Sequence, residues 1–276
     1  FNTLQMGTVA ASRVFKLINK SNINEQSLGV TDVKLYKGDI LFKNLSFSYK
    51  SGELVLEEVN LNIESGKTIA IVGPTGSGKT TLINLITRFY AIKNDKIFIG
   101  NTDINKLDLN VLRNNIGLIL QDTFLFSDTI YNNITFYHKK SKEEINELLK
   151  KMGLISFINS FPDGLDHQIG ERGVFLSMGQ RQLISFIRTY VSSVPILILD
   201  EATSSMDSDT EILIKKAINF LTRNKTSIII AHRLSTIKNA DKIIFLKEGR
   251  VMEKGTHEEL IKLKGLYWNY YKTQLV

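Results

Sequence analysis

The sequence predicts an α/β protein with a mixed, mostly parallel central sheet, an antiparallel β subdomain and an inserted all-α subdomain. Two observations lead to this fold class. Short apolar runs typical of strands alternate with amphipathic helical stretches, as they do in proteins with a parallel sheet. Between about residues 124 and 190 only helical patterns remain, so we expect an all-helical lobe that interrupts the sheet.

Composition excludes several classes of site. The chain has 276 residues, of which 43% are hydrophobic and 23% charged, and it contains no cysteine. Disulfides and thiolate metal sites are therefore excluded. No apolar run reaches the roughly 18 residues that a complete membrane-spanning helix needs. The formal net charge is +7, but the lysines are scattered along the chain, so we expect no nucleic-acid partner.

The first 63 residues fall into three parts. Residues 1–20 carry an apolar helical pattern, and residues 21–38 are rich in Asn, Ser, Lys and Gly, as linkers are. Alternating apolar residues from 40 to 63 predict antiparallel strands with a turn near Ser51. Because the chain begins at Phe1 rather than Met, we expect it to be a piece of a longer protein.

The central motif is Gly-Pro-Thr-Gly-Ser-Gly-Lys-Thr at residues 73–80, which matches the phosphate loop G-x-x-x-x-G-K-[ST]. A strand-like run precedes it and a helical pattern follows it, which argues against a chance glycine-rich turn. This context aims backbone N–H groups and a helix N-terminus at an anion. We therefore expect a nucleoside triphosphate, with Lys79 at its β- and γ-phosphates and the Thr80 hydroxyl on Mg²⁺. The residues expected to bind it are Gly73, Pro74, Thr75, Gly76, Ser77, Gly78, Lys79, Thr80 and Thr81.

Beyond this loop, strand and helix patterns continue to alternate. Ser141 and Glu144 have the spacing of a capping box, which predicts the start of a helix that reaches residue 152. A hairpin is expected at Glu248-Gly249. The further strands are expected at 96–99, 116–120, 196–199, 227–230 and 242–246, and the further helices at 81–90, from 177, at 209–221 and from about 257.

Polar side chains follow several predicted strands. Asp200 and Glu201 end one apolar run, and Gln121 and His232 follow two others. Because the carboxyl ends of parallel strands meet at one edge of a sheet, we expect these side chains beside the phosphate loop. Asp200 is suited to hold Mg²⁺, and Glu201 to accept a proton from an attacking water. A purely structural role for two adjacent carboxylates would require a partner for each.

Six motifs therefore follow one another between residues 38 and 276. After the phosphate loop come Gln121, Leu-Ser-Met-Gly-Gln at 176–180, Asp200-Glu201, Ser-Ser-Met-Asp at 204–207 and His232. This ordered set resembles the ATP-binding cassette (ABC) ATPases. Residues 1–19 resemble the end of the last transmembrane helix of ABC exporters, and Gly170–Gly173 resembles the exporter-specific X-loop. The resemblance implies a P-loop NTPase fold of ABC type and ATP hydrolysis that powers export.

The resemblance also implies a role for each motif residue. The catalytic residues would be Lys79, Gln121, Glu201 and His232, with Glu201 as the general base. Tyr49 would stack on adenine, Thr80, Gln121 and Asp200 would form the Mg²⁺ shell, His232 would contact the γ-phosphate, and Ser177, Gly179 and Gln180 would bind ATP held by a second copy. One position departs from the family pattern, because Met178 replaces the first of two signature glycines.

The resemblance extends to domains and partners. Residues 1–20 are expected to be the end of a transmembrane helix or a connecting helix, residues 21–38 a linker, and residues 39–276 the nucleotide-binding domain. The expected partners are a second nucleotide-binding domain and the coupling helices of a transmembrane domain. The aromatic and apolar stretch 124–134 would form the docking groove for a coupling helix, or would pack within its own lobe. The ATPase domain is expected on the cytoplasmic face of the cell membrane.

Three alternative functions compete with the exporter. A soluble ABC ATPase in DNA repair or translation is disfavoured because the chain has no long coiled-coil insertion, second cassette or basic arm. A separately encoded importer subunit is disfavoured by the helix before residue 20 and by the X-loop. A regulatory module that binds ATP without turnover is disfavoured because Glu201 is retained.

Overall fold

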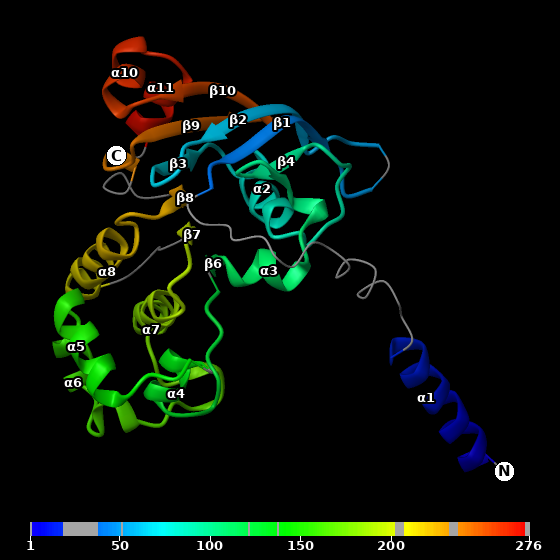
Figure 1. Ribbon diagram of the computed structural model, residues 1–276, viewed down its shortest axis with the longest axis vertical. Coiled ribbons are helices and arrows are strands. Elements are labelled where there is room, and N and C mark those ends of the chain that lie inside the picture. Colours follow the sequence, from blue (N-terminus) through cyan, green and yellow to red (C-terminus); the bar gives the residue numbers. More distant parts are fainter. Residues whose placement is uncertain are drawn as a thin grey trace.

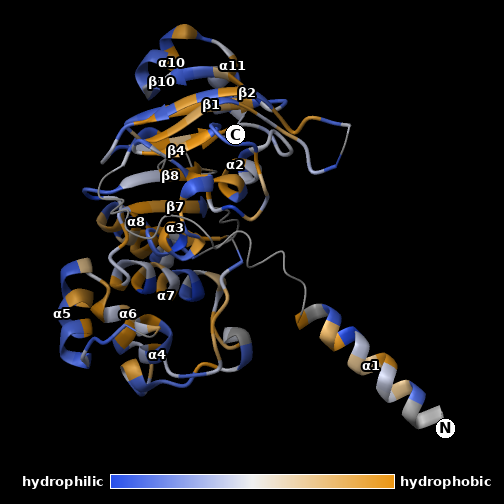
Figure 2. Cartoon of the chain, turned by 45° about the vertical axis from the view of Figure 1, so that its right-hand side comes forward, coloured by the Kyte–Doolittle hydropathy of each residue, from blue (hydrophilic) through white to orange (hydrophobic). Residues whose placement is uncertain are grey.

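Two β-sheets and a surrounding set of helices make up the protein, as Figure 1 shows. Apolar residues gather on the strands, and polar residues cover outer helices such as the one at 142–152 (Figure 2). The computed structural model describes residues 2–18, 38–50, 52–120, 122–136, 138–201, 207–231 and 237–273.

The central sheet consists of β3 (Thr68–Val72), β6 (Ile116–Ile119), β7 (Ile196–Glu201), β8 (Thr226–Ala231), β9 (Lys242–Lys247) and β10 (Arg250–Gly255). The strand order is β10-β9-β3-β8-β7-β6. Every neighbouring pair from β9 to β6 is parallel, and β10 joins β9 antiparallel through the predicted hairpin. The prediction of a mostly parallel sheet is confirmed, although β6 ends one residue earlier than expected.

The second sheet is antiparallel throughout and has the order β2-β1-β4-β5. Its strands are β1 (Ile40–Phe47), β2 (Leu56–Ile63), β4 (Ile97–Ile99) and β5 (Thr102–Asp103). The alternation of buried and exposed residues along β2 is the period-two pattern that predicted a strand with one buried face. The two-residue strand β5 was not expected, since it is too short to show a pattern.

The helices of the described chain lie around the two sheets, apart from α1 (Figure 1). The predicted capping box is confirmed, because Ser141 and Glu144 each bond to the other's backbone N–H. The helices are α1 (Asn2–Ile18), α2 (Lys79–Ile86), α3 (Leu109–Asn114), α4 (Ile130–Thr135), α5 (Lys142–Met152), α6 (Ile155–Asn159), α7 (Met178–Val191), α8 (Ser208–Leu221), α10 (His257–Leu263) and α11 (Leu266–Thr273), with short 3-10 turns at Ile104–Lys106, Gly164–Asp166 and Glu171–Gly173.

The end of the chain differs from the single helix that the sequence predicts. Helix α10 ends at Lys264, which has a left-handed backbone, and α11 begins two residues later. The carboxylate of Glu253 in β10 accepts hydrogen bonds from the backbone N–H groups of Leu266 and Tyr267 at 2.6 and 3.0 Å. A carboxylate from another element therefore caps α11 and sets its start.

Two hydrophobic clusters lie on opposite faces of the central sheet. One cluster joins the antiparallel sheet and α2 to residues such as Ile71 and Ile198. The other joins α4–α8 and the C-terminal helices to residues such as Val72 and Leu199. The helical lobe that interrupts the sheet therefore shares a core with it.

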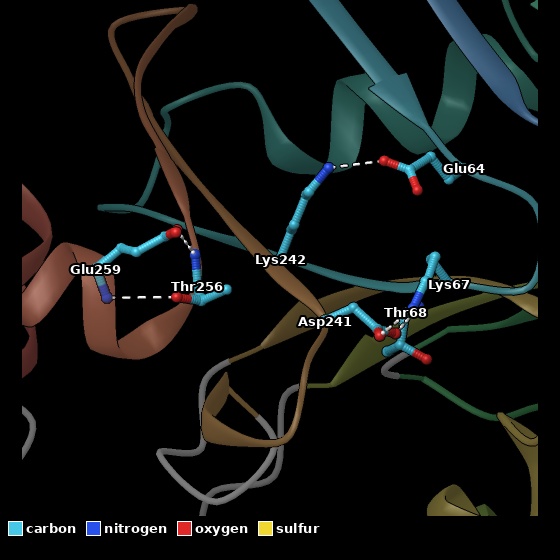
Figure 3. A network of polar contacts seen from close by, with 7 residues as sticks. All are labelled: Glu64, Lys67, Thr68, Asp241, Lys242, Thr256 and Glu259. Carbon is cyan, nitrogen blue, oxygen red and sulfur yellow. Dashed lines mark hydrogen bonds and ion pairs between the residues drawn. The ribbon is translucent and has the colours of Figure 1, made fainter.

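A polar network connects the strand starts at the end of the sheet opposite the phosphate loop (Figure 3). Lys67 forms an ion pair with Asp241 at 3.0 Å, and Lys242 forms one with Glu64 at 2.7 Å. Asp241 also accepts a hydrogen bond from the backbone N–H of Thr68 at 2.8 Å. The exposed charges add little stability, but the backbone hydrogen bond ties the starts of β3 and β9 together.

Helix α1 is exposed at residues 5–16 and 18, which include the apolar residues Met6, Val9, Val14, Phe15 and Ile18. Figure 1 shows it apart from the two sheets. Among the described residues, none of the helices is both long enough and apolar enough to cross a membrane.

Candidate active site

A cavity of about 540 Å³ opens beside the phosphate loop. It draws residues from distant parts of the chain, because β3, β7 and β8 are neighbours whose carboxyl ends share one edge of the sheet. The cavity is lined by Tyr49, Val55, Thr75, Gly76, Gly78, Lys79, Thr80, Thr81, Asp200 and Ile230. Most of the expected nucleotide-binding residues therefore surround one space.

Lys79 is the buried cation of this site, with 7% of its surface exposed. Its ammonium donates hydrogen bonds to the carbonyl oxygens of Gly73 and Pro74 at 2.9 and 2.8 Å. Burial lowers the pKa of Lys79, while the Asp200 carboxylate opposes that shift. A desolvated ammonium at the base of a cavity attracts a phosphate group strongly. The negative charge of the phosphate balances the charge of the ammonium better than neutral carbonyl groups do.

Two glycines show why the loop needs this residue type. At Gly73, where φ is +149°, a Cβ atom would lie 2.0 Å from the carbonyl oxygen of Leu246. At Gly76, φ is +79° and the space where a Cβ would stand is open. The first glycine lets the loop pass against β9, and the second gives the left-handed turn that wraps the loop around an anion.

Asp200 lies in β7 and lines the cavity together with Thr80 at the start of α2. A carboxylate and a hydroxyl are hard oxygen donors, which suit Mg²⁺ that takes its other ligands from phosphates and water. Within the described ranges, no group of three or more His, Cys, Asp or Glu residues is placed to hold a metal by itself. The donors present therefore fit a metal that arrives with a nucleotide.

Three of the expected catalytic groups fall on parts of the chain for which less is described. Gln121 and His232 lie outside the described residues, and for Glu201 only the backbone is described. That backbone ends β7 and pairs with Ala231, the last residue of β8. The strands that lead to Glu201 and to His232 therefore end side by side, as predicted.

The signature residues lie elsewhere. Ser177 is the N-cap of α7, and its hydroxyl accepts a hydrogen bond from the backbone N–H of Gln180 at 3.2 Å. The side-chain oxygen of Gln180 accepts one from the backbone N–H of Ser177 at 2.9 Å, so this amide closes a capping box. Ser177 and Met178 are exposed, whereas Gly179 is buried. None of these described residues lines the cavity.

Sequence analysis missed two residues of the cavity wall, Val55 and Ile230. Val55 lies just before β2 and Ile230 lies within β8, where each continues an ordinary apolar pattern. No signal in the sequence separates them from core residues, because only the spatial order of the strands brings them to the phosphate loop.

Comparison with known proteins agrees with this geometry. The family model for the ABC transporters matches residues 56–204, which include the phosphate loop, the signature and Asp200-Glu201. The chain belongs to the ABC transporter family, and its fold is the P-loop NTPase fold of ABC type. Its motifs are those of an exporter-type nucleotide-binding domain.

Individual relatives are similar to the chain along almost its whole length. The chain is 45% identical over 275 residues to an ATP-dependent lipid A-core flippase of Desulfotalea psychrophila, which covers 99% of this chain and 48% of the flippase. It is 44% identical over 273 residues to the multidrug resistance-like ATP-binding protein MdlB of Buchnera aphidicola, and the match covers 99% of this chain and 47% of MdlB. The structure of a bacterial Atm1-family ABC exporter with ATP bound aligns with a TM-score of 0.88 and 34% identity. The alignment covers 99% of this chain and 48% of the exporter chain. The chain spans about half the length of these relatives.

Proposed function

We propose that this chain binds and hydrolyses ATP and that hydrolysis powers the export of a substrate across a membrane. The observation that carries the proposal is the cavity in which Tyr49, the phosphate loop and Asp200 meet. Similarity to a flippase and to an exporter along 99% of the chain supports export as the direction of transport.

The expected site residues have defined tasks in this mechanism. Lys79 exchanges its loop carbonyls for the β- and γ-phosphates, and Tyr49 stacks on the adenine ring. Thr80, Gln121 and Asp200 would hold Mg²⁺, which would supply charge neutralisation. Glu201 accepts a proton from the attacking water, and His232 contacts the γ-phosphate.

A second copy of the domain completes the site. Ser177 stands exposed at the N-terminus of the 14-residue helix α7, outside its own chain's cavity. A helix N-terminus favours a negative charge, so this one suits the γ-phosphate of ATP held by a facing domain. Two domains facing head to tail would each bring Ser177, Gly179 and Gln180 to the other's nucleotide.

The membrane partner contacts the helical lobe in this proposal. Phe124 and Phe126 are exposed large apolar side chains, whereas Leu125 and Ile130 are buried, so part of the predicted docking stretch is available to a partner. A coupling helix of a transmembrane domain would lie on these rings, with the ATPase domain on the cytoplasmic face. In this arrangement residues 1–20 lead from the last transmembrane helix and residues 21–38 link it to the ATPase domain.

The test of this function is the Mg²⁺-dependent ATPase rate measured against protein concentration, for the native chain and for Glu201→Gln. We expect the rate to rise faster than linearly with concentration, because each site needs two chains. We expect Glu201→Gln to lower the rate by at least about 100-fold, because the amide cannot accept the proton. A linear rate that survives the substitution would contradict both the composite site and the assigned base.

A further inference from the structure

Three aromatic rings meet beside the cavity: those of Phe47, Tyr49 and Tyr90. The Tyr49 and Tyr90 ring centroids lie 4.8 Å apart with the planes at 77°, and those of Phe47 and Tyr49 lie 5.1 Å apart at 86°. Phe47 and Tyr90 complete the triangle at 6.0 Å. All three contacts are edge-to-face, the geometry that the ring quadrupoles favour.

Only one of these rings reaches the nucleotide space. Tyr49 lines the cavity, whereas Phe47 and Tyr90 are not among its lining residues. Phe47 is the last residue of β1 and packs against the core beneath the antiparallel sheet. Tyr90 follows the end of α2 and keeps 43% of its surface exposed. Tyr90 therefore supports Tyr49 from outside the cavity.

Tyr49 is held by a residue of α2 and by a residue that follows α2 in the chain. The hydroxyl groups of Tyr49 and Thr81 are 2.9 Å apart, within hydrogen-bond distance, and Thr81 lies in the first turn of α2 beside Lys79 and Thr80. Tyr90 contacts the ring of Tyr49 from beyond the other end of the same helix. Helix α2 and the segment that follows it thus carry the phosphate-binding residues and also contact a ring from the antiparallel sheet.

We propose that Tyr90 is a positioning residue, which holds the ring of Tyr49 in the orientation that stacks on the nucleobase. This inference rests on the proposed function, because it requires that Tyr49 contacts the base. Tyr90 acts through its ring and touches neither the base nor the phosphates. Its contribution is thus confined to ligands that carry a base, and phosphate binding by the loop does not depend on it.

The experiment is calorimetric titration of the full chain with Mg·ATP and, separately, with inorganic tripolyphosphate, which has phosphates but no base. Tyr90→Leu should raise the Kd for ATP by about three- to ten-fold, the fold-change that corresponds to one edge-to-face ring pair. It should change the Kd for tripolyphosphate by less than about two-fold. Tyr90→Phe keeps the ring and should retain the native ATP affinity. Phe89→Leu, at the exposed neighbouring phenylalanine, serves as the matched control and should have no effect.

Tyr49→Ala separates this inference from the function on which it rests. If Tyr49→Ala weakens ATP binding and Tyr90→Leu adds nothing in that background, both residues act through one contact, as proposed. Equal weakening of ATP and tripolyphosphate by Tyr90→Leu would overturn the positioning role, as would native ATP affinity in Tyr90→Leu alone. If Tyr49→Ala itself binds ATP normally, the assignment of Tyr49 to the base is wrong, and the role of Tyr90 fails with it.

Discussion

Among the described residues, two clusters of three aromatic rings lie at or near the surface, and they are built differently. The first, which we call the cavity cluster, consists of Phe47, Tyr49 and Tyr90. The second, the lobe cluster, consists of Phe124, Phe126 and Phe136 on the helical lobe. In the lobe cluster, Phe126 contacts Phe124 edge-to-face at 5.0 Å and stacks on Phe136 at 5.3 Å.

The difference lies in the polar groups beneath the rings. Within the described part of the chain, the side-chain hydrogen bond of the cavity cluster joins two neutral hydroxyls, those of Tyr49 and Thr81. Under the lobe cluster, the guanidinium of Arg188 donates to the backbone and side-chain oxygens of Asn133 at 2.7 and 3.0 Å and to the carbonyl oxygen of Phe124 at 3.2 Å. It also lies over the ring of Phe136, 5.4 Å from the centroid.

Asn133 completes this support from the inside of the lobe. It is buried, and its side-chain amide bonds to both the N–H and the carbonyl of Phe126 at 2.9 and 3.0 Å. Every polar atom of the amide is therefore satisfied, as a buried polar group requires. Arg188 belongs to α7, whose N-terminus carries the signature, so the lobe cluster is fixed to the signature helix.

The comparison teaches how each cluster would suit the task that the proposed function gives it. A ring that admits and releases a nucleotide gains from weak, adjustable support. A surface that transmits force from ATP to a partner needs a rigid attachment to the part of the site that moves. The charge-assisted network under the lobe cluster provides such an attachment, because charged hydrogen bonds are stronger than neutral ones.

The largest expected effect follows from removing the charge under the lobe cluster. Arg188→Met should lower the free energy of unfolding by on the order of 2–3 kcal/mol, because it leaves partly buried oxygens without their charged donor. Urea unfolding of the chain without nucleotide measures this change. Arg113→Met is the matched control. Arg113 also lies over a phenylalanine ring, that of Phe89, at 5.1 Å, but it is exposed, and its two hydrogen bonds are long, at 3.3 Å each. An equal loss in the two variants would mean that the hydrogen bonds of Arg188 to Asn133 and Phe124 stabilise the lobe cluster no more than an exposed arginine over a ring does.

The sequence predicted the phosphate loop and most of its surroundings because those signals are local. A glycine pattern between a strand and a helix specifies its own geometry, and residues that end parallel strands reach one edge of the sheet by topology alone. Lys79 and Asp200 meet at the cavity for these reasons, whereas Tyr49 follows the antiparallel strand β1 and was expected there only from the resemblance to the ABC ATPases.

The supports of both clusters could not be predicted, because they join residues far apart in the chain. Arg188 and Asn133 are separated by 55 positions, and neither belongs to a motif. Tyr90 meets Tyr49 only because α2 returns the chain toward the antiparallel sheet. The division of the C-terminal helix has the same cause, since Glu253 caps α11 from a neighbouring strand. Local patterns predict elements, whereas contacts between elements decide how a site is supported.

The next largest effect tests whether the lobe cluster is a docking surface. Phe126→Ser should leave the basal ATPase rate within about two-fold, because Phe126 does not line the cavity. In the assembled transporter it should lower transport by about ten-fold, the loss expected when an aromatic anchor of an interface is truncated. The measurements are ATPase activity in solution and substrate transport in proteoliposomes. Phe89→Ser, at an exposed phenylalanine outside the lobe, should alter neither rate. Parallel loss of ATPase and transport in Phe126→Ser would count against docking.

The smallest effect concerns the polar anchor of the cavity cluster. Tyr49→Phe keeps the ring and its two edge-to-face contacts but removes the hydroxyl that lies 2.9 Å from Thr81. One neutral hydrogen bond contributes about 0.5–1.5 kcal/mol, so we expect the Kd for ATP to rise by roughly two- to ten-fold, toward the lower end because Tyr49 is half-exposed. Titration with ATP measures this shift, and the same lost hydrogen bond should lower the unfolding free energy by no more than about 1 kcal/mol. A stability loss as large as that of Arg188→Met would mean that the hydroxyl contact is structural. The cavity cluster would then be as rigidly held as the lobe cluster, and its adjustment to a nucleotide would need another source.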